Sequence, residues 1–334
     1  MKISVCQVRG NSGADVWCTN HCQGLRAAGI DCTVEFFSPV YQFIPALGNV
    51  LGKIPDADII HGNSWNALAF RQKCPLVVTE LHVVHDPLFD PYRSAAQRAY
   101  HSWIFRCERK SFEIADAITC ISRYTQKKLE ECFGIRDSRM IYPGIDTDLF
   151  RPAIQKNDPC DIPPEKTVLF FAGNLSRRKG GDLLPAIMKD LGEDFILLLA
   201  TGQRGSDTGG IKSIINLGRL DLPRLVMAYN RCDIFLSASR LEGFGLSVAE
   251  AMACGKPVIA TNSASLPELV IDGKGGFLCR MDDVQDFTER IRYLATDENM
   301  RREMGRFNRA LTEEKFTLGR MTGEYLDVYQ DLLR

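Results

Sequence analysis

Two glutamates, Glu242 and Glu250, stand in the stretch RLEGFGLSVAEAMACGKPVIA with seven residues between them. The glycines Gly243 and Gly245 allow a ligand to approach the backbone closely. A helical pattern begins at Leu246, and the free amides of a helix N-terminus suit a phosphate. Carboxylates beside a phosphate site are better used as acceptors for hydroxyl groups. The stretch therefore predicts a ligand that is both a phosphate and a polyol.

A simpler explanation of this stretch stays open. Glycine-containing loops join strand to helix in most parallel sheets, and a glutamate early in a helix also favours the helix dipole. The stretch does not match the dinucleotide-binding pattern GxGxxG, because Val248 occupies the place of the third glycine.

A second group of candidate residues lies in FAGNLSRRKGGDLL. An apolar strand ends at Gly173, and Arg177, Arg178 and Lys179 follow before a helix begins near Asp182. Three cations at that place would neutralise a diphosphate, although a solvated basic turn is the alternative. Cations for phosphate and acceptors for hydroxyls in one domain together predict a nucleotide-sugar site.

The elements that must position these residues alternate along the chain as in a parallel, doubly wound sheet. Twelve short apolar runs predict strands: ISVCQV, CTVEFF, ADIIHG, PLVVTE, DAITCIS, RMIYPG, TVLFFAGN, FILLLAT, IKSIINLG, CDIFLSAS, PVIAT and GGFLC. The clearest helices are expected over 94–114 and 123–133. A proline-rich, aperiodic linker over 144–166 interrupts the rhythm.

We therefore expect an α/β protein with two doubly wound domains that face a cleft. Residues 1–150 would form the first domain and residues 151–314 the second. Residues 315–334 carry an apolar helical stripe that needs a partner surface, and we expect this last helix to pack back on the first domain.

Composition narrows the function classes. The 334 residues carry a net charge of −1, which gives no overall attraction to nucleic acid. No apolar run approaches the roughly 20 residues of a membrane span, and MKISVCQVRG lacks the features of a signal peptide. We expect a cytoplasmic protein with reduced thiols among its twelve cysteines.

Four motifs resemble the family four retaining glycosyltransferases, which have the GT-B fold with two Rossmann-like domains. EGFGLSVAEAMACGKPVIA resembles the family's E-x7-E signature and NLSRRKGG its GRLxxxKG loop. DAITCISRYTQKKL and IYPGIDTDLFRP resemble two further runs. The resemblance covers most of residues 110–330 and, more loosely, the first hundred. It implies an acceptor domain followed by a donor domain.

The resemblance implies a role for each matching position. Glu250 would accept the ribose hydroxyls of the nucleotide, Glu242 would lie beside the transferred sugar, and Lys179 would bind the diphosphate. The other implied substrate contacts are Gly243, Phe244, Gly245, Leu246, Arg177, Arg178, Gly218 and Arg219 in the donor domain, and Ser12 and Gly13 in the acceptor domain.

A cleft histidine is implied after the strand PLVVTE, where His82 and His85 are both candidates. His82 is preferred because it comes first after the strand, but either could instead cap a strand end. The chain also departs from the family pattern, since Asn174 stands where the family has an arginine. Arg177 or Arg178 would have to replace that cation.

The resemblance implies transfer of a sugar from a nucleotide-diphosphate sugar to an acceptor hydroxyl with retention of configuration, in polysaccharide, glycolipid or glycoconjugate biosynthesis. No metal or other cofactor is expected, although Asp56–Asp58 and Asp146–Asp148 form DxD tripeptides. An inactive nucleotide-sugar-binding subunit and a nucleotide-sugar epimerase remain alternatives.

The acceptor would be a sugar, a lipid-linked molecule or a small molecule. Residues 93–110 mix arginines with aromatic residues, which suits either peripheral contact with the inner face of a membrane or a core helix with solvated arginines.

Overall fold

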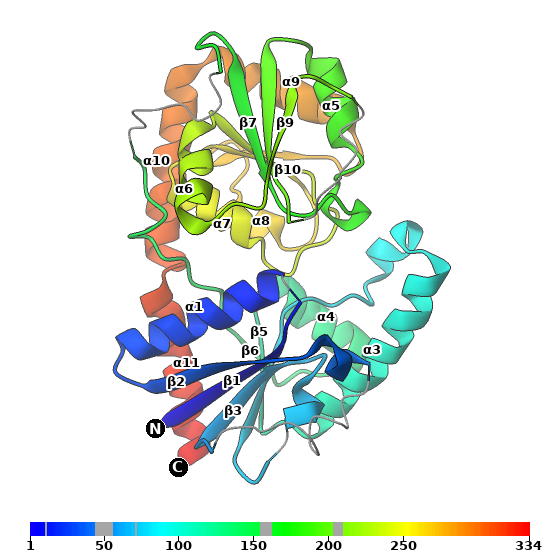
Figure 1. Ribbon diagram of the computed structural model, residues 1–334, viewed down its shortest axis with the longest axis vertical. Coiled ribbons are helices and arrows are strands. Elements are labelled where there is room, and N and C mark those ends of the chain that lie inside the picture. The colour runs from blue at the N-terminus through cyan, green and yellow to red at the C-terminus, as the bar shows by residue number, and fades with distance from the viewer. Residues whose placement is uncertain (11, 44–55, 71, 154–161, 203–209) are drawn as a thin grey trace. The chain divides into compact units, whose positions relative to one another are not determined.

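The structure is a computed structural model that describes residues 1–10, 12–43, 56–70, 72–153, 162–202 and 210–334. The chain divides into two compact units (Figure 1). Unit 1 comprises Met1–Gly144 and Phe316–Arg334, and unit 2 comprises Ile145–Lys315. The division after Gly144 precedes the boundary at residue 150 suggested by the sequence.

Unit 1 contains a six-stranded parallel sheet in the order β2-β1-β3-β4-β5-β6. Its strands are β1 Lys2–Val8, β2 Asp31–Phe37, β3 Ile59–Asn63, β4 Leu76–Glu80, β5 Ala117–Cys120 and β6 Arg139–Met140. Its helices are α1 Gly13–Ala27, α3 Ala95–Glu113, α4 Arg123–Phe133 and α11 Leu318–Leu333, with short 3₁₀ helices η1 Pro39–Gln42, η2 Ala67–Phe70 and η3 Pro87–Tyr92.

Unit 2 contains a second six-stranded parallel sheet, in the order β12-β11-β10-β7-β8-β9. Its strands are β7 Thr167–Ala172, β8 Phe195–Ala200, β9 Ile214–Gly218, β10 Ile234–Ser237, β11 Val258–Thr261 and β12 Gly276–Cys279. Its helices are η4 Arg177–Lys179, α5 Leu184–Leu191, α6 Leu222–Arg231, α7 Leu246–Ala253, α8 Leu266–Leu269, α9 Val284–Thr296 and α10 Glu298–Lys315.

All twelve predicted strands and the doubly wound fold are confirmed. The inner strands β3, β4, β10 and β11 are buried along their whole length, as parallel strands covered by helices must be, whereas the edge strands β2, β6 and β9 are partly exposed. In unit 2, β7 pairs with β8 on one side and β10 on the other, so the strand order reverses between β7 and β10. Ligands of such sheets bind at the carboxyl ends of the strands at this reversal. The two predicted donor-site loops follow β7 and β10.

Apolar packing holds each unit together. In unit 2, α5 lies beside α9 and α7 beside α10 (Figure 1), and the strand side chains form a buried core with α5 and α9. In unit 1, α11 packs against α1. Its residues Met321, Tyr325 and Tyr329 are fully buried in the core beside Trp17 and the strands β1, β3 and β4.

Candidate functional site

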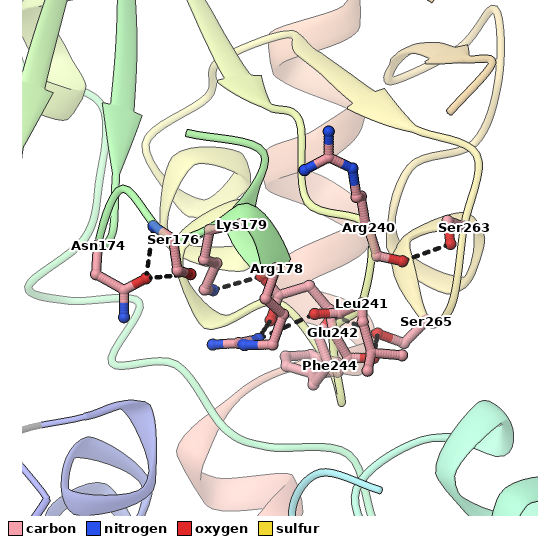
Figure 2. A network of polar contacts seen from close by, with 10 residues as sticks. All are labelled: Asn174, Ser176, Arg178, Lys179, Arg240, Leu241, Glu242, Phe244, Ser263 and Ser265. Carbon is pink, nitrogen blue, oxygen red and sulfur yellow. Dashed lines mark hydrogen bonds and ion pairs between the residues drawn. The ribbon is translucent and has the colours of Figure 1, made fainter. Parts of the chain in front are cut away.

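The loop after β7 is folded into a tight turn that presents Lys179. The side-chain oxygen of Asn174 accepts hydrogen bonds from the hydroxyl of Ser176, at 2.7 Å, and from its backbone amide, at 3.4 Å (Figure 2). The 3₁₀ turn Arg177–Lys179 follows and ends at Gly180. Asn174, the departure from the family pattern, therefore shapes the turn and supplies no charge.

Two glycines allow close packing of this turn, Gly180 against Ala238 after β10 and Gly181 against Leu175 in the turn itself. Gly180 has a φ of 70°, and a Cβ there would lie 2.0 Å from the carbonyl oxygen of Ala238. A Cβ on Gly181 would lie 2.5 Å from the backbone of Leu175. Neither space admits a side chain, and the φ of Gly180 is unfavourable for any other residue. Gly180 therefore allows the loop after β7 to lie against the loop after β10, and Gly181 allows the turn to close on Leu175.

Arg240, which was not predicted as a site residue, connects the loop after β10 to the loop after β7. Its side chain is only 4% exposed and makes an ion pair with Asp182, at 2.7 Å, and with Asp282, at 2.6 Å. It also donates to the carbonyl oxygen of Arg177, and its own amide donates to the carbonyl oxygen of Arg178. No sequence motif distinguishes this arginine from a ligand-binding one; its role follows from its two acidic partners.

Two serine hydroxyls donate hydrogen bonds to the backbone of the loop after β10. The hydroxyl of Ser263 donates to the carbonyl oxygen of Arg240, and that of Ser265 donates to the carbonyl oxygens of Glu242 and Phe244 (Figure 2). Ala264 between them has a φ of 53°. A left-handed conformation at a non-glycine residue costs free energy, so the surrounding contacts hold this turn in place.

Glu242 forms the centre of the site. Its side chain is 9% exposed and makes an ion pair with the amine of Lys179, and its second oxygen lies 3.6 Å from the guanidinium of Arg178. Burial opposes ionisation, but the two cations outweigh it and hold the pKa of Glu242 at about 2. Burial in turn lowers the pKa of Lys179, although Glu242 opposes this effect. Glu242 is thus a fixed carboxylate beside two cations.

Glu250 lies in α7, which begins after Gly245. Gly245 has a φ of 105°, which favours glycine. Glu250 is buried, and its Oε2 accepts a hydrogen bond of 2.6 Å from the hydroxyl of Tyr229 on α6. Burial raises the pKa of Glu250 to about 7. Within the described part of the chain its Oε1 accepts no hydrogen bond, which leaves that oxygen for a ligand.

The other predicted donor-site residues differ in their surroundings. Phe244 is 2% exposed, so its ring belongs to the core and only its backbone can contact a ligand. The side chain of Arg177 is exposed. Gly218 ends β9, two strands away from β7 at the edge of the sheet, and Arg219 follows it. Gly243 lies in the loop after β10, and Leu246 is the first residue of α7.

In unit 1, Ser12 and Gly13 begin α1 after β1, and Ser12 makes no capping hydrogen bond with its side chain. The two candidate histidines follow β4. The backbone amide of His82 donates to Oε1 of Glu80 at 2.7 Å, whereas the ring Nε2 of His85 lies 2.6 Å from Oε2 of Glu108. The structure thus gives each histidine a glutamate neighbour.

One aspartate of each DxD tripeptide accepts hydrogen bonds from backbone amides. Asp58 accepts a hydrogen bond from the amide of Lys2, and Asp146 accepts from the amides of Asp148 and Leu149. Across the described ranges, no group of three or more His, Cys, Asp or Glu side chains is placed to hold a metal ion.

Membrane contact through residues 93–110 stays a prediction. The helix α3 in this segment buries Ile104 and Cys107, while Trp103 is 39% exposed. Among the described residues there is no helix with the length and apolar character needed to cross a membrane.

Two protein families match the sequence. The family described as "Glycosyl transferases group 1" matches residues 155–311, and "Glycosyltransferase Family 4" matches residues 34–149. The sulfoquinovosyl transferase of Arabidopsis thaliana is 27% identical over 308 residues, which cover 84% of this chain and 59% of that protein. The chain spans little more than half the length of the curated relatives that it matches first.

Solved structures share the fold. The sucrose-phosphate synthase from Thermosynechococcus elongatus is similar with a TM-score of 0.84, at 20% identity over 100% of this chain and 99% of that one. A protein from Anabaena, solved in complex with UDP and glucose, is similar with a TM-score of 0.77 at 20% identity, over 99% of both chains.

Proposed function

We propose, starting from the fact that this chain belongs to the family four glycosyltransferases with the GT-B fold, that it transfers a sugar from a nucleotide-diphosphate sugar to an acceptor hydroxyl with retention of anomeric configuration. The observation that carries the proposal is the arrangement in unit 2. A glutamate paired with two cations, which hold its pKa at about 2, lies at the strand reversal, with a second glutamate on the adjoining helix.

The chemistry of transfer requires that the leaving diphosphate be stabilised as charge builds on it. Lys179 and Arg178 are the cations available for that purpose, and the amides at the start of α7 add to them. When a diphosphate binds, it competes with Glu242 for Lys179. Glu242 is then placed to accept the hydroxyls of the sugar and to favour positive charge at its anomeric carbon.

Glu250 suits the ribose of the nucleotide. One of its oxygens is held by Tyr229, so the carboxyl group has a fixed orientation, and the other oxygen accepts no hydrogen bond from the described residues. A carboxylate with one free oxygen can accept from a ribose hydroxyl. Since the similar Anabaena protein was solved in complex with UDP and glucose, we propose UDP-sugars as the first donors to examine. The chain's own residues supply the charges, and no metal is part of this proposal.

The acceptor differs among relatives. They include a D-inositol 3-phosphate glycosyltransferase of Saccharomonospora viridis and an alpha-maltose-1-phosphate synthase of Mycolicibacterium smegmatis. We propose an acceptor that is a sugar, a lipid-linked molecule or another small molecule, used in polysaccharide, glycolipid or glycoconjugate biosynthesis in the cytoplasm.

The test begins with the melting temperature in the presence of UDP, GDP, ADP and their sugars. A ligand at 100 times its Kd adds about 2.7 kcal/mol of stability, and we expect one nucleotide series to raise the melting temperature. Glu250→Ala should abolish the shift, whereas Glu289→Ala, an exposed glutamate on α9, should preserve it.

Turnover then distinguishes the alternatives. Slow hydrolysis of the stabilising donor, with the sugar released in its original anomeric form by NMR, supports the proposed retaining transferase. Binding of nucleotide without hydrolysis or transfer would favour an inactive binding subunit, and an epimerised sugar would favour an epimerase.

A further inference from the structure

Residues 145–153, the entry segment, bring the chain into unit 2 directly after the first stretch of unit 1. The sequence predicts these residues as the start of an aperiodic linker, but the structure folds them against unit 2. Ile145 is 1% exposed and Phe150 is 5% exposed. Between them, the side chain of Asp146 accepts a hydrogen bond from the amide of Leu149 at 3.0 Å, and its carbonyl oxygen accepts one from the amide of Phe150 at 2.9 Å. The proposed function assigns no role to this segment.

Arg309 on α10 binds the backbone of the entry segment. Its Nη1 donates to the carbonyl oxygens of Thr147, at 3.0 Å, and of Phe150, at 2.7 Å. The same nitrogen donates to the carbonyl oxygen of Ala253 at 2.9 Å. Ala253 is the last residue of α7, the helix that carries Glu250. One guanidinium group therefore joins the entry segment to the end of the Glu250 helix.

Asn230 on α6 binds the last part of the same segment. Its side-chain nitrogen donates to the carbonyl oxygen of Arg151 at 3.1 Å, and its side-chain oxygen accepts from the amide of Ala153 at 2.8 Å. A side-chain amide that both donates to and accepts from one stretch of backbone fixes the position of that stretch. Asn230 directly follows Tyr229, the hydrogen-bond partner of Glu250. The entry segment is therefore bound next to this tyrosine.

The ring of Tyr229 packs against three phenylalanine rings and is fully buried. Phe170 on β7 and Phe235 on β10 lie 5.0 Å and 5.6 Å from it between ring centroids, and the sheet fixes both of them. Phe150 of the entry segment lies 5.8 Å away, with the two rings at 80°. These contacts determine where the hydroxyl of Tyr229 points, and that hydroxyl donates to Oε2 of Glu250 at 2.6 Å. Phe150 is thus the one ring of the three that comes from outside the sheet.

We propose that the entry segment positions the nucleotide site: Phe150 holds the ring of Tyr229, Tyr229 orients Glu250, and Arg309 keeps the segment in place. The inference rests on the proposed function, which assigns Glu250 to the ribose of the nucleotide. If the ordered segment strengthens nucleotide binding, then by thermodynamic linkage the nucleotide stabilises the segment by the same factor. Because the segment is the connection that leaves unit 1 at Gly144, nucleotide binding also stabilises the start of that connection.

The first experiment measures hydrogen–deuterium exchange of the wild-type protein with and without the nucleotide that raises its melting temperature. We expect the amides of Leu149 and Phe150 to exchange roughly five times more slowly with nucleotide. The turn between α9 and α10 is the matched control, because Asp297 binds the third and fourth amides after it as Asp146 does. Equal slowing in both turns, or no slowing in the entry segment, overturns the proposal.

The ring of Phe150 is tested by shortening it. Phe150→Leu removes the contact with Tyr229 and should weaken nucleotide binding roughly fivefold, a typical effect for a residue that does not touch the ligand. Phe195→Leu is the matched control, because Phe195 is similarly buried, at 7% exposed, in the core beside α5 and α9. Both variants should lose stability, but the control should keep the wild-type affinity. An equal loss of affinity in both would contradict the role of Phe150.

A double-mutant cycle separates positioning from packing. If Phe150 acts through the hydroxyl of Tyr229, then Phe150→Leu should have no further effect on nucleotide affinity at pH 7 once Tyr229→Phe has removed that hydroxyl. Fold losses that multiply in the double variant would mean that Phe150 acts independently of the bond to Glu250, and the proposed order of contacts would be wrong.

The arginine that binds the segment has its own control on the same helix. Arg301 also donates from Nη1 to backbone carbonyl oxygens, those of Leu294 at 2.6 Å and Ala295 at 2.7 Å. Arg309→Met should weaken nucleotide binding and speed up amide exchange in the entry segment, whereas Arg301→Met should change neither. If Arg309→Met binds nucleotide as the wild type does, the segment does not position the site.

The hydroxyl hydrogen of Tyr229 provides a measurement without nucleotide. Since it is buried and donated to Glu250, it should exchange slowly with water and give a proton NMR signal that is lost in Tyr229→Phe. Phe150→Leu should speed up this exchange, and Phe195→Leu should not. If this difference is seen but no nucleotide binds, the proposed function is rejected and the positioning of Tyr229 stands. If a nucleotide binds but Phe150→Leu changes neither the exchange nor the affinity, the positioning alone is rejected.

Discussion

Each unit buries two glutamates at the carboxyl end of its sheet, yet the two pairs differ in charge. In unit 2, Lys179 and Arg178 keep the pKa of Glu242 at about 2. In unit 1, burial and then the neighbouring acid Glu108 raise the pKa of Glu80 to about 8. Burial is similar at both places, so the nearest charge decides whether a glutamate is an anion or a hydrogen-bond donor.

The remaining members of the pairs follow the same rule. Glu250 has a tyrosine hydroxyl as its partner and a pKa of about 7, and Glu108 has a neutral histidine and a strongly raised pKa. Unit 2 thus presents negative charge that cations balance, which suits a ligand with hydroxyls and phosphates. In unit 1, burial favours the neutral form of both glutamates, and no cation pairs with either of them among the described residues.

The largest effect is expected from removing Lys179, the cation that pairs with Glu242 and has no counterpart beside Glu80. In Lys179→Met, the buried carboxylate of Glu242 loses its ion-pair partner, which typically costs about 3–5 kcal/mol. Transfer should also fall roughly 100- to 1,000-fold, because a donor to the leaving diphosphate is lost. Melting temperature and kcat with the stabilising donor measure the two effects.

The double variant Lys179→Met with Glu242→Gln separates stability from activity. Since it buries a neutral amide in place of an unpaired carboxylate, most of the lost stability should return while transfer stays low. If the double variant is as unstable as the single one, the ion pair is not the reason why Glu242 can be buried as an anion.

A smaller effect is expected from changing the position of Lys179 while its side chain is kept. In Gly180→Ala the new Cβ would meet the carbonyl oxygen of Ala238, so the turn with Lys179 must move away from Glu242. Gly134→Ala is the matched control, because its φ of 72° and ψ of 16° resemble the 70° and 20° of Gly180, and nothing lies within 4 Å of its Cβ position.

The control should lose about 1 kcal/mol from the backbone conformation alone. Gly180→Ala should lose about 2–3 kcal/mol, since the displaced contacts add to that cost, and should also lose the nucleotide-induced rise in melting temperature. Equal losses in both variants would show that the close approach to Ala238 contributes nothing.

The sequence predicted the strands because each is an apolar run with turn residues at its ends. The helix 123–133 was predicted at its observed limits, since Ser122 caps its start and Gly134 takes a left-handed conformation at its end. These signals are local, so they can be recognised in the sequence without knowledge of the fold.

The contacts of the site were not predictable in the same way. Lys179 and Glu242 were assigned to separate parts of a ligand, whereas the structure pairs them with each other. Tyr229 follows the periodicity of a core helix, and nothing local connects it to Glu250. Arg240 shows no local sign of its ion pairs with Asp182 and Asp282. Such pairings arise between segments far apart in the chain.

Unit 1 can be tested through the pH dependence of stability. Because the folded-state pKa of Glu80 is raised to about 8, its contribution to stability is full below its unfolded pKa and is lost as pH rises through 8. Glu80→Gln does not titrate, and its amide oxygen can still accept from the amide of His82. Its melting temperature should therefore rise relative to wild type between pH 5 and pH 8.

The difference should grow by at most about 1.4 kcal/mol per pH unit, the limit for one proton. Glu242→Gln supplies the contrast, because the folded-state pKa of Glu242 is depressed to about 2 and its contribution is already complete above pH 5. A constant difference between Glu80→Gln and wild type would show that Glu80 is ionised in the folded protein, and the comparison between the units would fail.

The smallest effect is expected at Glu250, whose pKa lies between those of Glu242 and Glu80. Its pKa of about 7 is raised by burial and held down by the hydroxyl of Tyr229, and a hydrogen bond of about 0.5–1.5 kcal/mol corresponds to at most about one pKa unit. Ribose hydroxyls need the carboxylate form as their acceptor, so nucleotide affinity should rise with pH through 7.

In Tyr229→Phe the pKa of Glu250 should rise, and the midpoint of the affinity profile should move up by as much as about one pH unit. Nucleotide binding at pH 7 then weakens several-fold and recovers at pH 9, whereas Tyr293→Phe, at an exposed ring on α9, keeps the wild-type profile. If Tyr229→Phe weakens binding equally at every pH, the hydroxyl orients Glu250 without setting its charge, because only a pKa effect disappears once the carboxylate is fully ionised.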